Sequence, residues 1–166
     1  MEYSDIYLGN SIYVSARVKQ DSFFYHKAKC LSAMIKLSLP FLREHIEFPD
    51  HVAFRLATIK GRTLGYYNNF KGFVVIDVKS SFEKTLKIIA HELVHAEQYY
   101  QGRLSNQVEF SSPKYVWNGQ VYNPVKSSTN YEKYRNLPWE VEAFQREETI
   151  AASVHQQIMK KYFSNS

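Results

Sequence analysis

The 166-residue sequence contains a single cysteine, Cys30. A disulfide within the chain, a thiolate zinc site and an iron–sulfur cluster each need two or more cysteines, so all three are excluded. Any bound metal must therefore be held by histidines and carboxylates. The sequence also lacks a run of roughly 18 apolar residues, the length of a membrane span, and Met1 to Asp5 do not resemble the start of a secretory signal. We expect a cytoplasmic protein that does not enter a membrane.

A long basic stretch is missing too, since no block of lysine and arginine is denser than Lys160-Lys161. Lys and Arg number 21 against 16 Asp and Glu, and the resulting net charge of +5 is ordinary for a soluble protein. Nucleic acid is therefore an alternative partner, not the favoured one. Aromatic residues are abundant at 16%, with 13 Tyr and 11 Phe. This content suits an aromatic-lined cleft, base stacking or a tyrosine-rich core.

Length and hydrophobic periodicity predict one α+β domain over residues 1–166. A short strand is expected over Ile12–Val18. Apolar residues at spacings of three and four then predict an amphipathic helix from about Phe23 to Glu47, which Pro40 should kink or interrupt.

Three strands and a capped helix follow. Alternating residues over Val52–Leu56 and Leu64–Tyr66, on either side of Lys60-Gly61-Arg62, predict two strands joined by a tight turn. The β-branched run Phe73–Val78 predicts a buried strand of the same sheet. A serine followed three residues later by glutamate marks the start of a helix over Ser80–Gly102.

The pattern returns to β between Arg103 and Arg135. Two short strands on either side of Asn118-Gly119 predict a hairpin, because this dipeptide adopts the tight turn that hairpins prefer. A last helix is expected to begin near Pro138, with Asn136 or Leu137 as its cap.

The capped helix contains His91-Glu92-Leu93-Val94-His95. Histidines four residues apart on a helix lie on one face, close enough to bind one zinc ion. Zinc lowers the pKa of a bound water, and Glu92 would accept its proton so that hydroxide attacks a carbonyl. A helix with two incidental histidines is the alternative, but the position after a buried strand favours the metal site.

Two histidines do not complete a zinc site that keeps one position open, so a third protein ligand is needed. His155 is the only histidine downstream of the motif, and Glu140 and Glu142 lie in the first turns of the final helix. Residues two apart on a helix face nearly opposite ways, so the two glutamates cannot both be ligands. Gln98 follows His95 by three residues on the same face, where it could hydrogen-bond a ligand or substrate or could simply line the helix.

Over roughly Leu64 to Gln156 the sequence resembles the zincin metallopeptidases. The resemblance rests on the buried strand, on the His91-Glu92-Leu93-Val94-His95 motif in the helix that follows it, and on Glu140-Val141-Glu142-Ala143 in the final helix. The sequence is most similar to gluzincins, whose third zinc ligand is a glutamate, and especially to small intracellular or phage-encoded members. The resemblance implies a zincin-like α+β fold in which a small mixed or antiparallel sheet packs against the helix that bears the motif. An N-terminal helix, a β-hairpin insertion and a C-terminal helix would complete it. The implied function is zinc-dependent hydrolysis of a protein or peptide substrate, with Glu92 activating the water.

The resemblance also implies individual roles. The family pattern Glu-x-x-Ala matches Glu140 and Ala143, which favours Glu140 over Glu142 as the third ligand after His91 and His95. Phe144 stands where these families often have Asp or Asn.

A downstream Tyr or His often stabilises the oxyanion in these families, and we assign that role to Tyr134, with Tyr131 and His155 as alternatives. The strand from Gly65 to Tyr67 would pair with the substrate backbone.

Two other functions stay open. A SprT-like protease acting on DNA-bound proteins would fit the basic charge, but that family uses a third histidine shortly after the motif, and none lies between Glu97 and Glu140. A basic, aromatic-rich module that binds nucleic acid or protein, with a structural or degenerate zinc site, is the non-enzymatic alternative. Glu92 argues against it, because a structural site has no need of a base.

Overall fold

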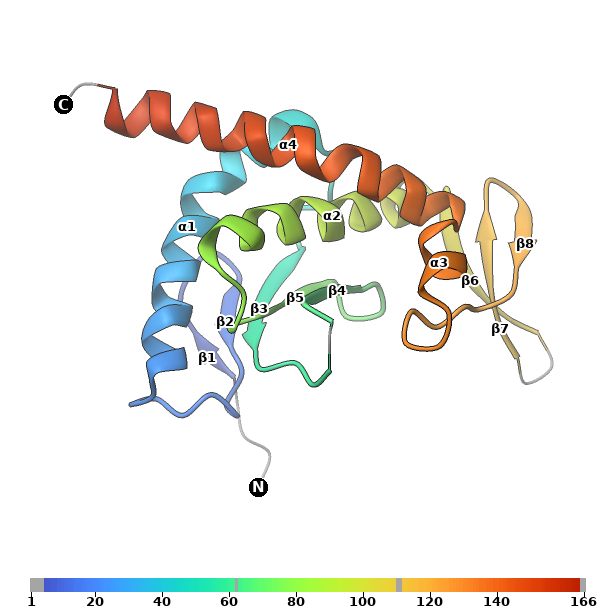
Figure 1. The fold of residues 1–166 in the computed structure, drawn as a ribbon, viewed down its shortest axis with the longest axis horizontal. Coiled ribbons are helices and arrows are strands. Elements are labelled where there is room, and N and C mark those ends of the chain that lie inside the picture. The colour runs from blue at the N-terminus through green and yellow to red at the C-terminus, as the bar shows by residue number, and fades with distance from the viewer. Residues whose placement is uncertain (1–4, 62, 110–111, 165–166) are drawn as a thin grey trace.

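A computed structural model describes residues 5–61, 63–109 and 112–164. The helices are α1 (Phe23–His45), α2 (Phe82–Tyr100), α3 (Tyr131–Arg135) and α4 (Pro138–Phe163). The strands are β1 (Ile6–Tyr7), β2 (Ile12–Val14), β3 (Ala53–Ala57), β4 (Gly65–Asn68), β5 (Phe73–Asp77), β6 (Leu104–Glu109), β7 (Ser112–Trp117) and β8 (Gln120–Tyr122). Figure 1 shows a mixed α+β arrangement, which confirms the predicted fold class at this level.

The main sheet has five strands in the order β1-β2-β3-β5-β4. Strands β2, β3 and β5 run parallel, while β1 and β4 are antiparallel edges. The predicted hairpin between the strands at Val52–Leu56 and Leu64–Tyr66 is therefore wrong, because β5 lies between β3 and β4; Arg62 of that turn lies outside the described residues. The physical reason is burial: β3 and β5 are almost wholly buried and take the centre, whereas β4 is only partly buried and takes the edge.

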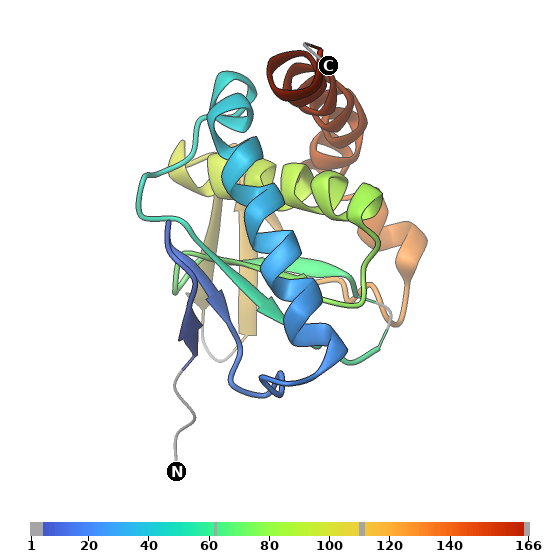
Figure 2. The ribbon, with the colours of Figure 1, turned by 90° about the vertical axis from the view of Figure 1, so that its left-hand side faces the viewer.

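Helices cover this sheet in two layers. α1 connects the parallel strands β2 and β3 and packs on β2, and α2 packs on β4 and β5. The long helix α4 lies across both α1 and α2 (Figures 1 and 2). The main apolar core fills the space between these layers, and among the described residues no helix is long and apolar enough to cross a membrane. This arrangement places α2 between the sheet and α4, so most of its length is buried.

The ends of the helices follow the local signals closely. Ser22 caps α1, Ser81 caps α2, and α4 begins with Pro138 after Leu137. Of the two effects expected of Pro40, a kink or an interruption of the first helix, the interruption is wrong, because α1 continues through Pro40 to His45. Tertiary packing of the buried face of α1 on the sheet and α4 offsets the lost backbone hydrogen bond.

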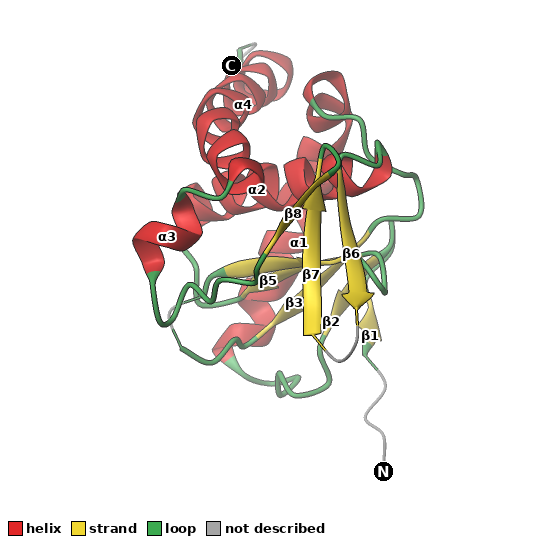
Figure 3. Cartoon of the chain, turned by 90° about the vertical axis from the view of Figure 1, so that its right-hand side faces the viewer, coloured by secondary structure: helices red, strands yellow, loops and turns green. Residues whose placement is uncertain are grey.

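A second, three-stranded sheet in the order β6-β7-β8 lies to one side of the first in Figure 1 and in front of it in Figure 3. Its β7–β8 turn is the predicted one, with positive φ at both Asn118 and Gly119. The expectation of β structure as far as Arg135 is wrong, because α3 forms there with its first turn capped by Asn130. Trp139 packs against Tyr115 and Tyr122 of this sheet and so fixes the start of α4.

Candidate metal centre

The two histidines of the motif lie on the buried face of α2, where their imidazoles meet. The Nε2 atoms of His91 and His95 are 3.2 Å apart, and the ring centroids are 4.8 Å apart. The i, i+4 spacing produces this juxtaposition, and α4 covers both rings. The predicted pairing of the histidines is therefore present in the fold.

Glu140, in the first turn of α4, places its carboxylate beside the Nε2 atoms of the two histidines. Its Oε2 lies 3.4 Å from His91 Nε2, and its Oε1 lies 3.5 Å from His95 Nε2. One donor atom from each residue falls within 4.8 Å of the others, and all three residues are buried. This group could hold a metal ion.

The donor set fits a cation. Glu140 Oε2 is buried and makes no hydrogen bond among the described residues, so its charge needs a cation beside it: the imidazolium of His91 at 3.4 Å, or a metal ion that takes the place of the proton. Burial alone would raise the pKa of Glu140, but the neighbouring His91 and His95 hold that pKa at about 2. The carboxylate is thus ionised and directed at two imidazole nitrogens, which suits a metal that takes nitrogen and oxygen ligands.

The far nitrogen of each imidazole has its own partner. His91 Nδ1 lies 2.6 Å from Glu147 Oε2, and His95 Nδ1 lies 2.8 Å from Gln98 Oε1. Both contacts leave Nε2 directed at Glu140, the arrangement in which a histidine binds a metal through Nε2. The contact predicted for Gln98 is thus made to a histidine.

Glu147 is a partner of His91 that was not predicted from the sequence, although its position carries a signal. Glu147 follows Glu140 by seven residues, which is two helical turns and hence the same face of α4. Phe144 lies between them on that face, and its ring packs on His91 at 4.7 Å between centroids. The acidic partner of His91 therefore comes one turn later than the position at which the zincin resemblance expects Asp or Asn.

Glu92 lies beside the histidine pair on the buried face of the helix. Burial raises the pKa of Glu92, although the nearby His91 and His95 act in the opposite direction. The backbone N–H of Tyr67 in β4 donates a hydrogen bond to the Glu92 carboxylate. The side chain that the sequence assigned as general base is therefore fixed between the metal group and the edge strand.

Tyr134 in α3 is a hydrogen-bond partner of the Glu140 side chain. Burial raises the pKa of Tyr134 above its ordinary value, and the negative charge of Glu140 raises it further. Its hydroxyl therefore stays protonated and can donate a hydrogen bond. Of the alternatives to Tyr134, Tyr131 is 54% exposed, and His155 is an exposed residue fifteen positions beyond Glu140 on α4, which corresponds to roughly 22 Å along the helix.

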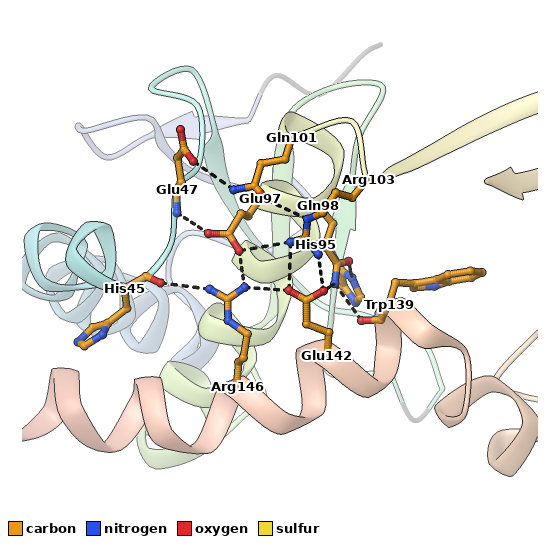
Figure 4. Close-up of polar contacts among 10 residues, drawn as sticks. All are labelled: His45, Glu47, His95, Glu97, Gln98, Gln101, Arg103, Trp139, Glu142 and Arg146. Carbon is orange, nitrogen blue, oxygen red and sulfur yellow. Dashed lines mark hydrogen bonds and ion pairs between the residues drawn. The ribbon is translucent and has the colours of Figure 1, made fainter. Parts of the chain in front are cut away.

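Glu142 points away from the metal group. Its carboxylate accepts hydrogen bonds from Arg103 at 2.5 and 3.0 Å and from Arg146 at 3.1 Å (Figure 4). These charged hydrogen bonds lower the pKa of Glu142, against the effect of burial. Of the two candidate glutamates, the fold brings Glu140 to the histidines and gives Glu142 to the arginines.

No protein-family model, curated protein or solved structure matches this chain. Function is therefore inferred from the residues of this group and their geometry alone.

Proposed function

We propose that the protein is a zinc-dependent metallopeptidase with a zincin-like fold, in which His91, His95 and Glu140 bind zinc. The observation that carries the proposal is the convergence of two imidazole Nε2 atoms and one carboxylate within 4.8 Å, all buried. Two nitrogens and one oxygen from three protein residues form the ligand set of hydrolytic zinc sites, which keep a further position open. The position of α2 beneath α4 and beside an antiparallel edge strand supports the zincin-like fold.

When bound, zinc would lower the pKa of a water molecule and polarise a substrate carbonyl. Glu92 is the general base in this proposal: its carboxylate takes the proton from the water and later delivers it to the leaving amine. Its raised pKa suits both transfers, because a base that must also act as an acid works best near neutral pH.

Tyr134 is the proposed oxyanion donor. Its hydroxyl lies next to Glu140 and stays protonated, so it can donate to an oxygen that gains negative charge during attack. The neutral Tyr134 hydroxyl would thus donate a hydrogen bond beside the proposed zinc ligands.

The substrate backbone would lie along β4. This strand is the last of the five-stranded sheet, so one side of it has no strand partner within the described residues. Its other side pairs with β5, and Tyr67 within it contacts Glu92. An extended peptide that added to this edge would bring its carbonyl groups close to the proposed base.

The decisive variant is Glu92→Gln, with Glu83→Gln on the exposed first turn of α2 as the matched control. We expect the Glu92 variant to retain zinc, measured by metal analysis, and to lose roughly 10²–10⁴-fold in the rate of cleavage of an unfolded protein substrate. The control should keep both properties. Wild-type protein that binds no zinc, or a Glu92 variant that cleaves at the wild-type rate, would contradict the proposal.

The same variant distinguishes the non-enzymatic alternative. A module that binds nucleic acid through its basic residues would show binding that weakens with salt and is unchanged by Glu92→Gln. A peptidase would show cleavage that depends on Glu92.

A further inference from the structure

Gln98 is a completely buried polar side chain between the two helices that carry the metal group. Its amide group contacts residues of both α2 and α4 (Figure 4). Oε1 faces His95 Nδ1 at 2.8 Å, while Nε2 donates to the backbone carbonyl of Trp139 at 3.0 Å and lies 3.4 Å from Glu142 Oε2. The side chain therefore connects a histidine on α2 to the backbone of α4.

We propose that Gln98 is a positioning residue that fixes the tautomer of His95 and the placement of Glu140 relative to it. The inference rests on the proposed zinc site and assigns Gln98 a role in forming it. The proposal concerns metal binding and does not depend on the substrate.

The tautomer follows from hydrogen-bond chemistry. A backbone carbonyl and an ionised carboxylate can only accept, so the Gln98 NH2 group must face Trp139 and Glu142. Oε1 is then the atom that faces His95, and because it can only accept, Nδ1 of His95 must carry the hydrogen. In the neutral imidazole, which is the form that binds a metal, the lone pair of His95 is thereby left on Nε2, the atom that points at Glu140.

The placement of Glu140 follows from the second contact. The carbonyl of Trp139 belongs to the peptide bond that leads directly into Glu140, so Gln98 binds α4 at the residue before the proposed ligand. One amide therefore sets the distance between the imidazole of His95 and the backbone that carries the Glu140 carboxylate. Pre-organisation of this kind reduces the ordering that metal binding requires.

Charged groups around Gln98 keep its environment fixed. Arg146 binds both Glu142 and Glu97, and it also donates to the carbonyl of His45 at 3.1 Å. Glu97 in turn accepts a hydrogen bond from the backbone N–H of Glu47 at 2.7 Å. These contacts join the end of α1, α2 and α4 (Figure 4), so the acceptor that faces the Gln98 amide is itself held in place.

The test compares Gln98→Leu with Gln101→Leu. Gln101 is the control because it is the same residue type at the C-cap of α2, three residues after Gln98, where it donates to Glu47 at 3.1 Å and accepts from Arg103 at 2.8 Å but does not contact a histidine. Zinc affinity is measured by competition with a chelator, and cobalt is added to metal-free protein to record its visible absorption. We expect Gln98→Leu to lose roughly 10–100-fold in zinc affinity and to change the cobalt spectrum, while Gln101→Leu keeps both at wild-type values.

A measurement on the wild type covers the case in which Gln98→Leu does not fold. In the zinc-loaded protein, ¹⁵N spectra of the histidine side chains should show a protonated Nδ1 and a metal-bound Nε2 for His95. Metal on Nδ1, or wild-type zinc affinity and cobalt spectrum in a folded Gln98→Leu, would overturn the role of Gln98. Absence of zinc from the wild type would overturn the proposed function as well, whereas zinc binding that depends on Gln98 without peptide cleavage would overturn the peptidase alone.

Discussion

Glu140 and Glu142 show how two residues of one type, two positions apart, acquire different roles. Glu140 is buried against His91 and His95 with an unpartnered oxygen, whereas Glu142 forms charged hydrogen bonds with Arg103 and Arg146. Half a helical turn separates the directions of the two side chains, so each faces a different set of neighbours. Removing one or the other should therefore have different consequences.

We expect Glu140→Ala to abolish zinc binding, with a loss larger than the roughly 10–100-fold typical of residues that only orient a ligand. Glu142→Ala should retain zinc but lower the free energy of unfolding by about 1–2 kcal/mol, because two partly buried arginines lose a shared acceptor. Metal analysis and urea unfolding of both variants check this. Zinc kept in Glu140→Ala and lost in Glu142→Ala would reverse the ligand assignment.

The pH dependence of metal binding follows from the protonation of the histidine ligands, both of which have a raised pKa. Burial alone would lower the pKa of His91, but the carboxylates of Glu140 and Glu147 raise it to about 10. In metal-free protein at neutral pH, His91 is therefore the charged imidazolium, and zinc must displace one of its two ring protons. We expect the apparent zinc affinity to rise about tenfold per pH unit between pH 6 and 8 for each proton released. Affinity that is independent of pH in chelator competition would contradict this protonation state.

At the scale of elements, β4 and α2 approach unusually closely at Gly65. A Cβ atom on Gly65 would lie 2.4 Å from Ile88 Cγ2 and 3.1 Å from the carbonyl oxygen of Val75. Glycine is thus required at the point where the edge strand crosses the helix that carries the motif. This contact sets how near β4 lies to Glu92.

Gly65→Ala should destabilise the protein by about 1–3 kcal/mol, the usual cost of overpacking. The double variant with Ile88→Ala should recover part of that loss, because Ile88 provides the closest of the clashing atoms. Thermal unfolding of both variants, with Ile88→Ala alone as the reference, measures the recovery. Equal stability of wild type and Gly65→Ala would show that the strand can shift away without cost.

At the scale of the whole molecule, the candidate metal group joins parts of the chain that are far apart in sequence. The ligands come from α2 and α4, and the second sheet with α3 lies between these helices along the chain. A bound ion would therefore act as a cross-link between two layers of the fold.

Zinc at a free concentration 100 times its dissociation constant should stabilise the folded state by about 2.7 kcal/mol. For a chain of this length that corresponds to a rise in Tm of about 5–10 °C. Differential scanning calorimetry with zinc, and after removal of zinc by a chelator, measures the shift, and Glu140→Ala should show none. An unchanged Tm in the wild type would mean that zinc does not bind the native state preferentially.

The sequence by itself determined the local features. Ser81 and Pro138 mark the starts of two helices, Asn118-Gly119 marks a hairpin, and the i, i+4 spacing of His91 and His95 puts two imidazoles on one face. Each of these depends on interactions within a few residues. Periodicity also gave the α+β class, since helical and strand patterns alternate along the chain.

Only the tertiary structure decided the order of β3, β4 and β5, the approach of Glu140 rather than Glu142, and the contact of Glu147 with His91. Strand order depends on which runs gain most from burial at the centre of the sheet, which is a comparison across the whole domain. The partners of Glu140 and Glu147 depend on how α4 crosses α2, and that crossing is set by core packing between residues more than forty positions apart.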